Sequence, residues 1–234
     1  MPRRTPTDRL EQLVDCATRV FVEQGYRRTQ MSDVADALGV AKGTLYLYVE
    51  SKEALFDLVL RFADAERPFV DPPALPVPTP RAGATLRFVQ ERLAQEARFP
   101  TLEVAQARRR GTDAARELEE IVRELFGVLA RNRRGIVLVD RSARDYPELA
   151  ALWFTGGRGG IVAAFAAYLD DRIRRKRLRP VPDTFVAARL IIETIVFWAV
   201  HRHWDAHPQE VDDAVALDSV VRFVVGALEV RSER

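Results

Sequence analysis

A polar and aromatic stretch near the N-terminus has the side chains of a nucleic-acid contact surface. Residues 42–48 read KGTLYLY. Lys42 offers a positive charge for a phosphate, and the hydroxyls of Thr44 and of the two tyrosines can bond phosphate oxygens or base edges. Leu47 suits the methyl group of a thymine, and Gly43 lets backbone N–H groups come close to an anion. These residue types predict a helix that lies against double-stranded DNA.

Two residues outside this stretch extend the predicted surface. Lys52 supplies a second positive charge for phosphate, and Thr29 supplies a further hydroxyl. Only three of the 36 basic residues are lysines, and two of the three lie in this region. The formal net charge is only +2, so binding to a polyanion has to come from a local patch. The predicted DNA contacts are Thr29, Lys42, Gly43, Thr44, Tyr46, Leu47, Tyr48 and Lys52.

The elements that carry these residues have the pattern of a helix-turn-helix. One short helix is expected over about 30–38, with Thr29 as its N-cap, and a second over about 42–48. Gly39 follows the first helix where a left-handed backbone conformation can end it, and the short turn has the length that this motif needs. The alternative is a helical hairpin inside a core, with the tyrosines half buried. The expected apolar seam is Val34, Leu38, Val40 and Leu45.

Helical patterns continue on both sides of this motif. An amphipathic helix is expected over about 7–24 and is ended by Gly25. Ser51 is placed to cap a fourth, longer helix. Six prolines then fall between residues 68 and 80, a density that excludes a continuous helix. This proline-rich segment is either a lid-like loop or an extended connector.

Residues 21–56 resemble the DNA-binding domain of TetR-family transcriptional regulators. The shared features are the lead-in Phe-x-x-x-Gly-Tyr, the Gly-Val turn, the KGTLYLY helix and SKEAL at the start of the fourth helix. The resemblance covers about the first quarter of the chain. It implies DNA-contact roles for every predicted contact except Leu47, and a DNA-binding domain over residues 1–52. Ala41 stands where the family often has a serine cap, and Val49 where phenylalanine is usual, which affects the contact geometry rather than the fold.

The rest of the chain has helical patterns throughout. We find no strand alternation and no internal repeat, so the expected fold class is all-α. The resemblance implies that residues 53–234 form a helical ligand-binding and dimerisation domain. The expected helices are about 82–98, 101–109, 113–131, 134–144, 147–176, 183–205 and 209–230.

Two late helical patterns are apolar around more of their circumference than one core face needs. Residues 161–176 and 183–204 therefore suggest a core on one side and a second subunit on the other. The resemblance also implies a buried small-molecule site in this part of the chain. Aromatic residues at helical spacing are more often plain core, so pocket residues are candidates only. These candidates are Phe99, Phe126, Trp153, Phe154 and Trp198.

The three histidines do not predict a metal site. His201 and His203 are two residues apart, so on a helix they point to nearly opposite sides. His203 and His207 could share a metal, but His207 precedes a proline at a helix end, where a histidine complements the helix dipole. We therefore expect neither a metal nor a cofactor. Glu193 could meet a cationic ligand, but Arg189 lies four residues earlier and can pair with it.

The composition is that of a soluble globular protein, with 47% hydrophobic and 30% charged residues. The single cysteine, Cys16, excludes an internal disulfide and a cysteine-based zinc site. The N-terminal charges are not followed by the apolar segment of a signal peptide. The most apolar run begins at Leu190, is broken by Glu193 and is too short to span a bilayer. We expect a cytoplasmic protein without membrane contact.

These patterns predict a ligand-responsive transcriptional regulator, in the simplest form a homodimeric repressor on a palindromic operator. A small apolar or aromatic molecule is expected to release it from DNA. The alternatives are an all-α enzyme whose N-terminal helices only resemble a DNA reader, and a helical interaction module with a degenerate DNA domain. Against an enzyme, the glycine-rich run 156–160 has no preceding strand, and no nucleophile motif occurs. Salt-dependent binding to random duplex would separate either alternative from the regulator.

Overall fold

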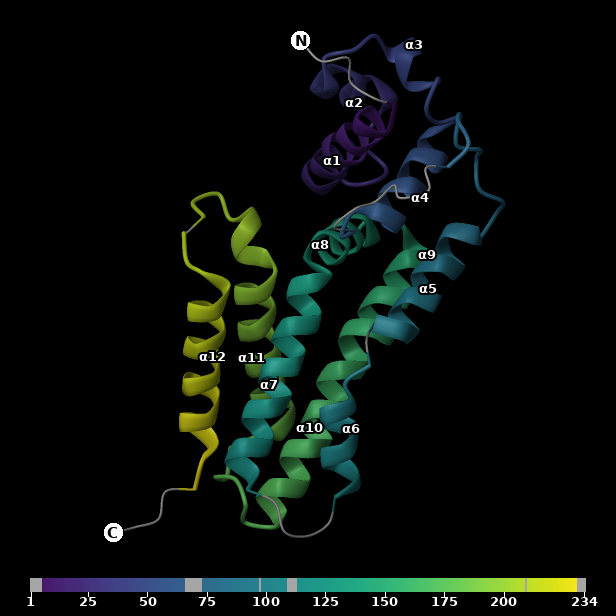
Figure 1. Ribbon diagram of the computed structural model, residues 1–234. Coiled ribbons are helices and arrows are strands. Elements are labelled where there is room, and N and C mark those ends of the chain that lie inside the picture. The colour runs from purple at the N-terminus through teal and green to yellow at the C-terminus, as the bar shows by residue number, and fades with distance from the viewer. Residues whose placement is uncertain (1–5, 66–72, 97, 109–112, 209, 231–234) are drawn as a thin grey trace. The chain divides into compact units, whose positions relative to one another are not determined.

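The protein is built from helices that pack as pairs and bundles (Figure 1). The computed structural model describes residues 6–65, 73–96, 98–108, 113–208 and 210–230. Within these residues no strand forms, and β-type pairing is limited to two isolated bridges, Val49 with Val77 and Leu178 with Glu229. The all-α prediction is confirmed.

The helix bounds follow the predicted pattern, with differences in the second half of the chain. The helices are α1 Pro6–Gln24, α2 Met31–Leu38, α3 Lys42–Leu45, α4 Lys52–Phe62, α5 Ala84–Glu96, α6 Pro100–Ala107, α7 Ala114–Arg131, α8 Arg133–Ala143, α9 Pro147–Ala150, the π-helix η1 Ala151–Arg158, α10 Gly159–Arg174, α11 Thr184–Ala199, the 3₁₀ helix η2 His201–Trp204 and α12 Asp213–Leu228.

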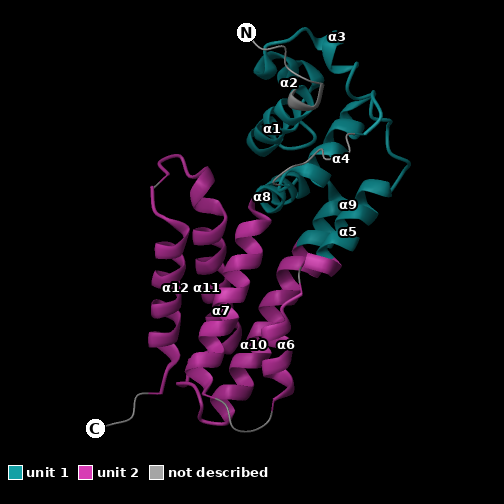
Figure 2. Ribbon diagram, in the orientation of Figure 1, with its two compact units in different colours: residues 1–93, 134–153 teal, residues 94–133, 154–234 magenta. Residues whose placement is uncertain are grey.

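Packing divides the chain into two compact units, coloured separately in Figure 2. Unit 1 comprises Met1–Leu93 and Arg134–Trp153, and unit 2 comprises Ala94–Arg133 and Phe154–Arg234. Each unit therefore contains segments that are distant in sequence. The expected domain boundary at residue 52 does not coincide with the limits of these packing units, and it stays a prediction.

The core of unit 1 is built around the inner faces of α1, α2 and α4. Leu13 and Phe21 of α1 pack with Leu55 of α4, and all three are fully buried. Gly25 ends α1 with a positive φ of 83°, as predicted. Cys16 is buried where α1 meets α2, with its Sγ 3.9 Å from the carbonyl oxygen of Val34. The α1, α2 and α4 helices thus form one packed body beneath α3.

Two predicted helix caps have different outcomes. Ser51 caps α4, because its Oγ accepts a hydrogen bond from the Ala54 N–H at 3.1 Å. The prediction that Thr29 caps α2 is wrong, because the N-cap is Gln30, whose N–H donates to Asp33 Oδ2 at 2.8 Å. The Thr29 hydroxyl instead donates to the carbonyl oxygen of Gly25 at 2.7 Å. The Thr29 hydroxyl thus bonds to a backbone carbonyl oxygen one turn earlier instead of capping α2.

Unit 2 is a bundle in which α10 and α11 lie side by side, and α7 packs against both α11 and α12 (Figure 1). Its core includes fully buried apolar side chains, such as Ile121 of α7, Phe165 of α10 and Ile195 of α11. The helix predicted over 147–176 is continuous, but its middle part, Ala151–Arg158, is π-helical. Sequence periodicity does not distinguish that short change of winding.

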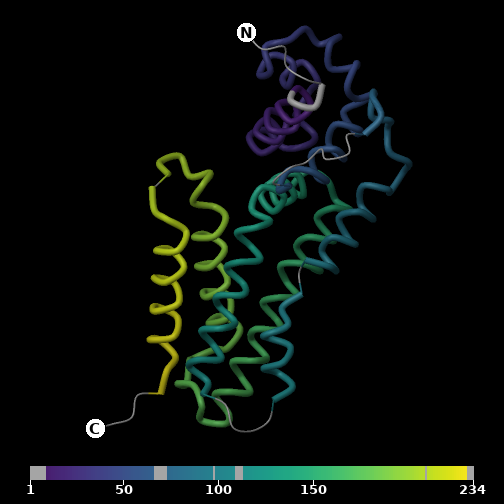
Figure 3. Tube along the Cα trace, in the orientation of Figure 1, coloured from purple at the N-terminus to yellow at the C-terminus, as the bar shows by residue number. Residues whose placement is uncertain are grey.

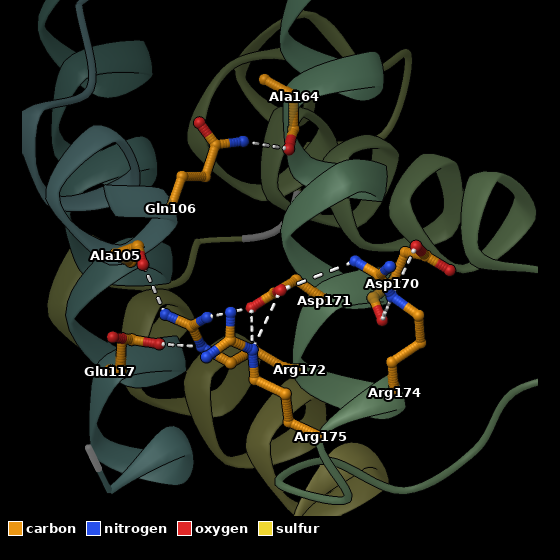
Figure 4. A network of polar contacts seen from close by, with 9 residues as sticks. All are labelled: Ala105, Gln106, Glu117, Ala164, Asp170, Asp171, Arg172, Arg174 and Arg175. Carbon is orange, nitrogen blue, oxygen red and sulfur yellow. Dashed lines mark hydrogen bonds and ion pairs between the residues drawn. The ribbon is translucent and has the colours of Figure 1, made fainter. Parts of the chain in front are cut away.

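A buried ion network joins α6, α7 and α10 inside unit 2 (Figure 4). Arg172 of α10 is 2% exposed, and its Nε donates to Glu117 Oε1 of α7 at 2.7 Å. Its two terminal nitrogens donate to Asp171 and to the carbonyl oxygen of Ala105 in α6. Burial, together with the Glu117 carboxylate, raises the pKa of nearby Tyr168 above its usual range. With all three guanidinium nitrogens engaged, Arg172 fastens helices to one another.

The helical stretch Pro147–Arg174 is long and apolar enough to cross a membrane by length and composition alone. Its α10 part buries Phe165, Leu169 and Arg172 in the core of unit 2. A single helix that meets this criterion does so by length and composition only, and the buried Arg172 within it has protein partners. The stretch is therefore weak evidence for a membrane span.

Candidate nucleic-acid interface

The turn between α2 and α3 has the geometry that the sequence predicts. Gly39 has φ 71° and ψ 36°, which is the left-handed conformation, and its N–H donates to the carbonyl oxygen of Asp36 at 3.1 Å. The Val40 N–H donates to the carbonyl oxygen of Ala35 at 3.0 Å. These bonds satisfy the last carbonyl groups of α2 and turn the chain into α3. The helix-turn-helix pattern is confirmed at this position.

The α3 helix buries one side chain and presents most of the others to solvent. Leu45 is fully buried in the core of unit 1. Tyr46 is 42% exposed and Leu47 is 67% exposed. Lys42 is exposed, and Thr44 is partly buried. Charge, hydroxyl groups and apolar surface are therefore accessible to solvent within residues 42–47, the combination that phosphate and base-edge contacts require.

Gly43 and Tyr48 complete the surface on and just after α3. Gly43 is exposed, and a Cβ atom added there would meet nothing within 4 Å. Tyr48 is partly buried and packs against the core of unit 1. Regular helix ends at Leu45, earlier than predicted, and the turn at Tyr46 to Tyr48 follows it. The six residues from Lys42 to Tyr48 other than Leu45 thus stay the predicted contact surface.

Thr29 and Lys52 use their polar atoms inside the protein. Thr29 is 1% exposed, and its hydroxyl is bonded to Gly25 as described above. The Lys52 ammonium donates to the carbonyl oxygens of Tyr26, Arg27 and Thr29 at 3.2, 3.4 and 3.1 Å. It also lies 4.7 Å from the centre of the Tyr26 ring. This geometry makes Lys52 a clamp on the loop between α1 and α2, and the DNA contacts predicted for both residues stay predictions.

The same loop contains candidates that the sequence analysis missed. Arg27 and Arg28 are exposed and lie just before Thr29 and the Gln30 N-cap of α2. In the sequence, the available signal was the pair of adjacent arginines ahead of the first helix of the motif.

The Tyr26 hydroxyl, next to these arginines in sequence, donates a hydrogen bond to Glu53 Oε1 at 3.3 Å. Burial and the Glu53 carboxylate raise the pKa of Tyr26 to about 12.

Residues 13–59 match the sequence family of bacterial regulatory proteins known as the tetR family. The predicted resemblance of the N-terminal region to the tetR family is confirmed by this match. The chain is 43% identical over 53 residues to the HTH-type transcriptional repressor KstR2 of Rhodococcus jostii, covering 23% of this chain and 26% of that protein. It is 38% identical over 60 residues to the fatty acid metabolism regulator protein of Bacillus subtilis, covering 26% and 30%. The matches thus span less than a third of each curated relative.

Solved tetR-family structures resemble the whole fold. A family member from Streptomyces coelicolor is 23% identical, with a TM-score of 0.56 over 98% of this chain and 94% of that one. The ketosteroid transcriptional regulator KstR2 of Mycobacterium tuberculosis is 18% identical, with a TM-score of 0.57 over 95% and 96%. At these identities the likeness shows a shared helical architecture beyond the tetR N-terminal domain.

The predicted pocket aromatics do not gather in one compact unit. Phe99 and Phe126 are buried in unit 2, Trp198 is partly buried there, and Phe154 is 39% exposed. Trp153 belongs to unit 1, where it packs against the core and its Nε1 donates to Asp140 Oδ1 at 2.9 Å. A surface pocket of unit 2 between α7 and α12 is lined by other side chains. Its lining residues are Glu119, Arg123, Asp218, Val221, Arg222, Val225, Gly226 and Glu229.

The candidate metal and cation sites are occupied by protein contacts. Among the described residues, no three or more His, Cys, Asp or Glu side chains come together as a metal site would need. His203 Nε2 lies 2.6 Å from Arg133 Nη1 and 3.6 Å from Asp213 Oδ1. Burial and the adjacent arginines lower the pKa of His203. Glu193 pairs with Arg189 at 2.8 Å, as predicted, and with Arg158 at 2.7 Å.

Proposed function

We propose that the protein is a DNA-binding transcriptional regulator that reads duplex DNA with the exposed face of α3. The observation that carries this proposal is the placement of Leu45 in the core while Lys42 of α3, and Tyr46 and Leu47 in the turn that follows it, face solvent. A hairpin inside a core would not leave Leu47 67% exposed. The membership of residues 13–59 in a family of bacterial regulatory proteins supports the same function. The named relatives are regulators rather than enzymes.

The proposed assembly is a homodimer formed through α11 and α12. On α11, Val186, Leu190 and Phe197 share one helix face and are 55%, 65% and 41% exposed. On α12, Val215 and Phe223 are 58% and 71% exposed. Large apolar side chains in such a stripe are covered by a partner in a stable soluble protein. A two-fold dimer would present two α3 helices to a palindromic operator with half-sites about 34–36 Å apart.

The proposed effector is a small apolar or aromatic molecule that binds among the later helices and lowers operator affinity. A ligand can shift DNA binding only if it prefers one arrangement of the reading helices over another. Within unit 1, Asp64 connects α4 to two other helices, so that a movement of those helices can reach α4. It follows α4, and its carboxylate accepts from the Arg134 N–H at 2.8 Å, the Gly135 N–H at 3.0 Å and Arg92 at 3.2 Å. The end of α4 is thereby fixed to α5 and to the start of α8.

Gly135 shows how closely this junction is packed. A Cβ atom at Gly135 would lie 2.5 Å from Asp64 Oδ2, which is closer than real Cβ contacts. Burial raises the pKa of Asp64, while Arg92 and the two backbone N–H groups of α8 lower it. Because α8 and the end of α4 are packed this closely, a shift of α8 would move the end of α4 with it.

As a regulator of bacterial genes, the protein would act in the cytoplasm.

The test is selection of duplexes from a random-sequence pool with the purified protein, followed by affinity measurements on the selected site. We expect a palindromic sequence, and Tyr46→Ala or Thr44→Ala should weaken its binding by roughly 1–3 kcal/mol. Tyr46→Phe is the matched control that separates the hydroxyl from the ring. If no sequence is enriched over random duplex, or if both alanine variants bind the selected site normally, the proposed function is wrong. Thermal-shift screening with apolar compounds, then operator titration, tests the effector.

A further inference from the structure

The described part of the proline-rich segment, residues 73–80, contacts the residues between α3 and α4. We call residues 73–80 the strap. The Val77 N–H donates to the carbonyl oxygen of Tyr48 at 2.8 Å, and the Glu50 N–H donates to the carbonyl oxygen of Val77 at 3.0 Å. Together they form the isolated parallel bridge between Val49 and Val77. In the chain trace the strap runs past the junction of α3 and α4 (Figure 3).

The prolines of the strap leave very few backbone donors, and these donors are used at that junction. Pro76, Pro78 and Pro80 have no N–H, so only Val77 and Thr79 can donate between residues 76 and 80. The Thr79 N–H donates to Glu50 Oε2 at 2.8 Å. Proline rings also fix φ, so this segment loses little conformational entropy when it pairs. The strap is therefore a stiff element with its hydrogen bonds directed at one place.

That place is the end of α3 and the cap of α4. The Thr79 hydroxyl donates to Ser51 Oγ at 2.8 Å, and Ser51 Oγ is the atom that caps α4. The regular part of α3 is four residues long and has no side-chain hydrogen bond at its N-cap. One turn of helix is not stable by itself, so its position depends on neighbouring contacts. Val77 is partly buried and packs against the same core that holds Leu45.

We propose that the strap is a positioning element for DNA recognition, in which Val77 and Thr79 fix the exit of α3 so that Tyr46 and Tyr48 are held at the DNA surface. This inference rests on the proposed function. The strap has no charged side chain between residues 73 and 80, so it offers no point charge to a phosphate. Its effect on DNA binding passes through the backbone of Tyr48 and Glu50.

The variants divide into those that break the strap and those that do not. Val77→Pro removes the N–H that bonds to Tyr48, whereas Val77→Ile keeps the N–H and the apolar side chain. Thr79→Val removes an exposed hydroxyl and tests the same junction with little risk to folding. The matched control is Thr85→Val, since the Thr85 hydroxyl donates to Asp57 Oδ1 at 2.8 Å, away from α3. Tyr46→Ala is the control for DNA recognition itself.

Each variant is titrated with the selected operator and with random duplex, and its urea midpoint is measured. We expect Val77→Pro to lower operator affinity about 10-fold and Thr79→Val about 3-fold, with random-duplex affinity unchanged within about 2-fold. Val77→Ile and Thr85→Val should retain the wild-type ratio of the two affinities. Hydrogen exchange should show faster exchange of the Glu50 amide in Val77→Pro.

The outcomes separate this inference from the function on which it rests. If Tyr46→Ala weakens operator binding while Val77→Pro and Thr79→Val do not, the strap does not position the reading helix. If Val77→Pro lowers both duplex affinities in step with the urea midpoint, the strap only stabilises the fold, and the inference is also wrong. If the wild-type protein prefers no sequence, the proposed function fails and the inference fails with it.

Discussion

The two compact units expose chemically different faces. The face of α3 in unit 1 combines an ammonium group, hydroxyl groups, an aromatic ring and one leucine. The faces of α11 and α12 in unit 2 expose Val186, Leu190 and Phe223 in apolar stripes. The first composition suits a hydrated, charged partner, and the second suits a partner that excludes water. The exposed fraction of a surface alone thus does not indicate its partner, whereas the chemical character of the exposed side chains does.

The units also use their key internal cations differently. Lys52 of unit 1 is partly exposed and donates to neutral carbonyl oxygens. Arg172 of unit 2 is 2% exposed and is held by Glu117, itself 6% exposed. A buried charge that loses its partner costs far more than a half-exposed one, because water cannot replace the partner. The cost of breaking each contact should therefore differ between the units.

The largest expected effect is on the stability of unit 2. Glu117→Ala leaves the guanidinium of Arg172 buried without its α7 partner and should lower the free energy of unfolding by roughly 3–5 kcal/mol. Glu117→Gln keeps a hydrogen-bond acceptor and should cost less. The control on the same helix is Glu119→Ala, whose ion pair with Arg123 is about 40% exposed and should be worth at most about 1 kcal/mol. Urea denaturation measures all three, and equal losses for the two alanine variants would contradict the comparison.

The next effect concerns the apolar face. Phe223→Glu places a charge in the centre of the proposed dimer interface, so the protein should become monomeric and lose roughly 100-fold in operator affinity. Val104→Glu, at a valine of α6 that is 47% exposed, is the matched control and should change neither property. Light scattering and fluorescence anisotropy measure the two quantities. A Phe223→Glu protein that remains dimeric would place the interface elsewhere.

A smaller effect distinguishes Lys42 from Lys52. Lys42→Met should flatten the dependence of log affinity on log salt concentration by about one unit, as expected for one lost phosphate contact. Lys52→Met should leave that slope unchanged and lower the urea midpoint, because its ammonium is engaged with three carbonyl oxygens. Titrations at several salt concentrations distinguish the two. A flattened slope in Lys52→Met would instead restore its predicted role at phosphate.

The smallest expected effect is at alkaline pH. The pKa of Tyr26 is raised from 10.0 to about 12, so the folded state favours its neutral phenol. This contribution to stability is fully present below the unfolded pKa of 10.0 and is lost as the pH rises through about 12. Tyr26→Phe should therefore make the urea midpoint fall less steeply across this window. The exposed Tyr46→Phe variant is the control, and parallel profiles for wild type and Tyr26→Phe would contradict the shift.

Local features of the helix-turn-helix region were predictable because their causes lie within a few residues of one another in the sequence. Gly39 supplies the left-handed conformation where α2 ends, and Ser51 caps the helix that it precedes. The strap was not predictable, because Val77 pairs with Tyr48 and Glu50 through backbone atoms that leave no side-chain pattern. The bonds of Lys52 to carbonyl oxygens escape sequence analysis for the same reason.

Unit 2 shows a second limit of sequence analysis. Arg172 and Glu117 are 55 residues apart, and each alone looks like an ordinary charge on a helix. The apolar stripe of α11 was predictable as surplus hydrophobicity, because the pattern over 183–204 carries more apolar residues than one core face uses. The same expectation for 161–176 stays a prediction, since α10 exposes no large apolar side chain, and the stripe of α12 was not among the predicted surplus patterns. The sequence could not show which of the aromatic candidates line a pocket, because buried core aromatics and ligand-lining aromatics have the same spacing.

The buried position of Cys16 gives the protein a built-in chemical reporter. It is the only cysteine in the sequence, it is 2% exposed, and burial raises the pKa of its thiol. A thiol-specific reagent therefore reacts only when α1 and α2 separate, and the rate of labelling counts those openings without any engineered residue. A dye attached to a cysteine introduced on the surface would also be site-selective, because the natural thiol stays protected on the timescale of the coupling reaction.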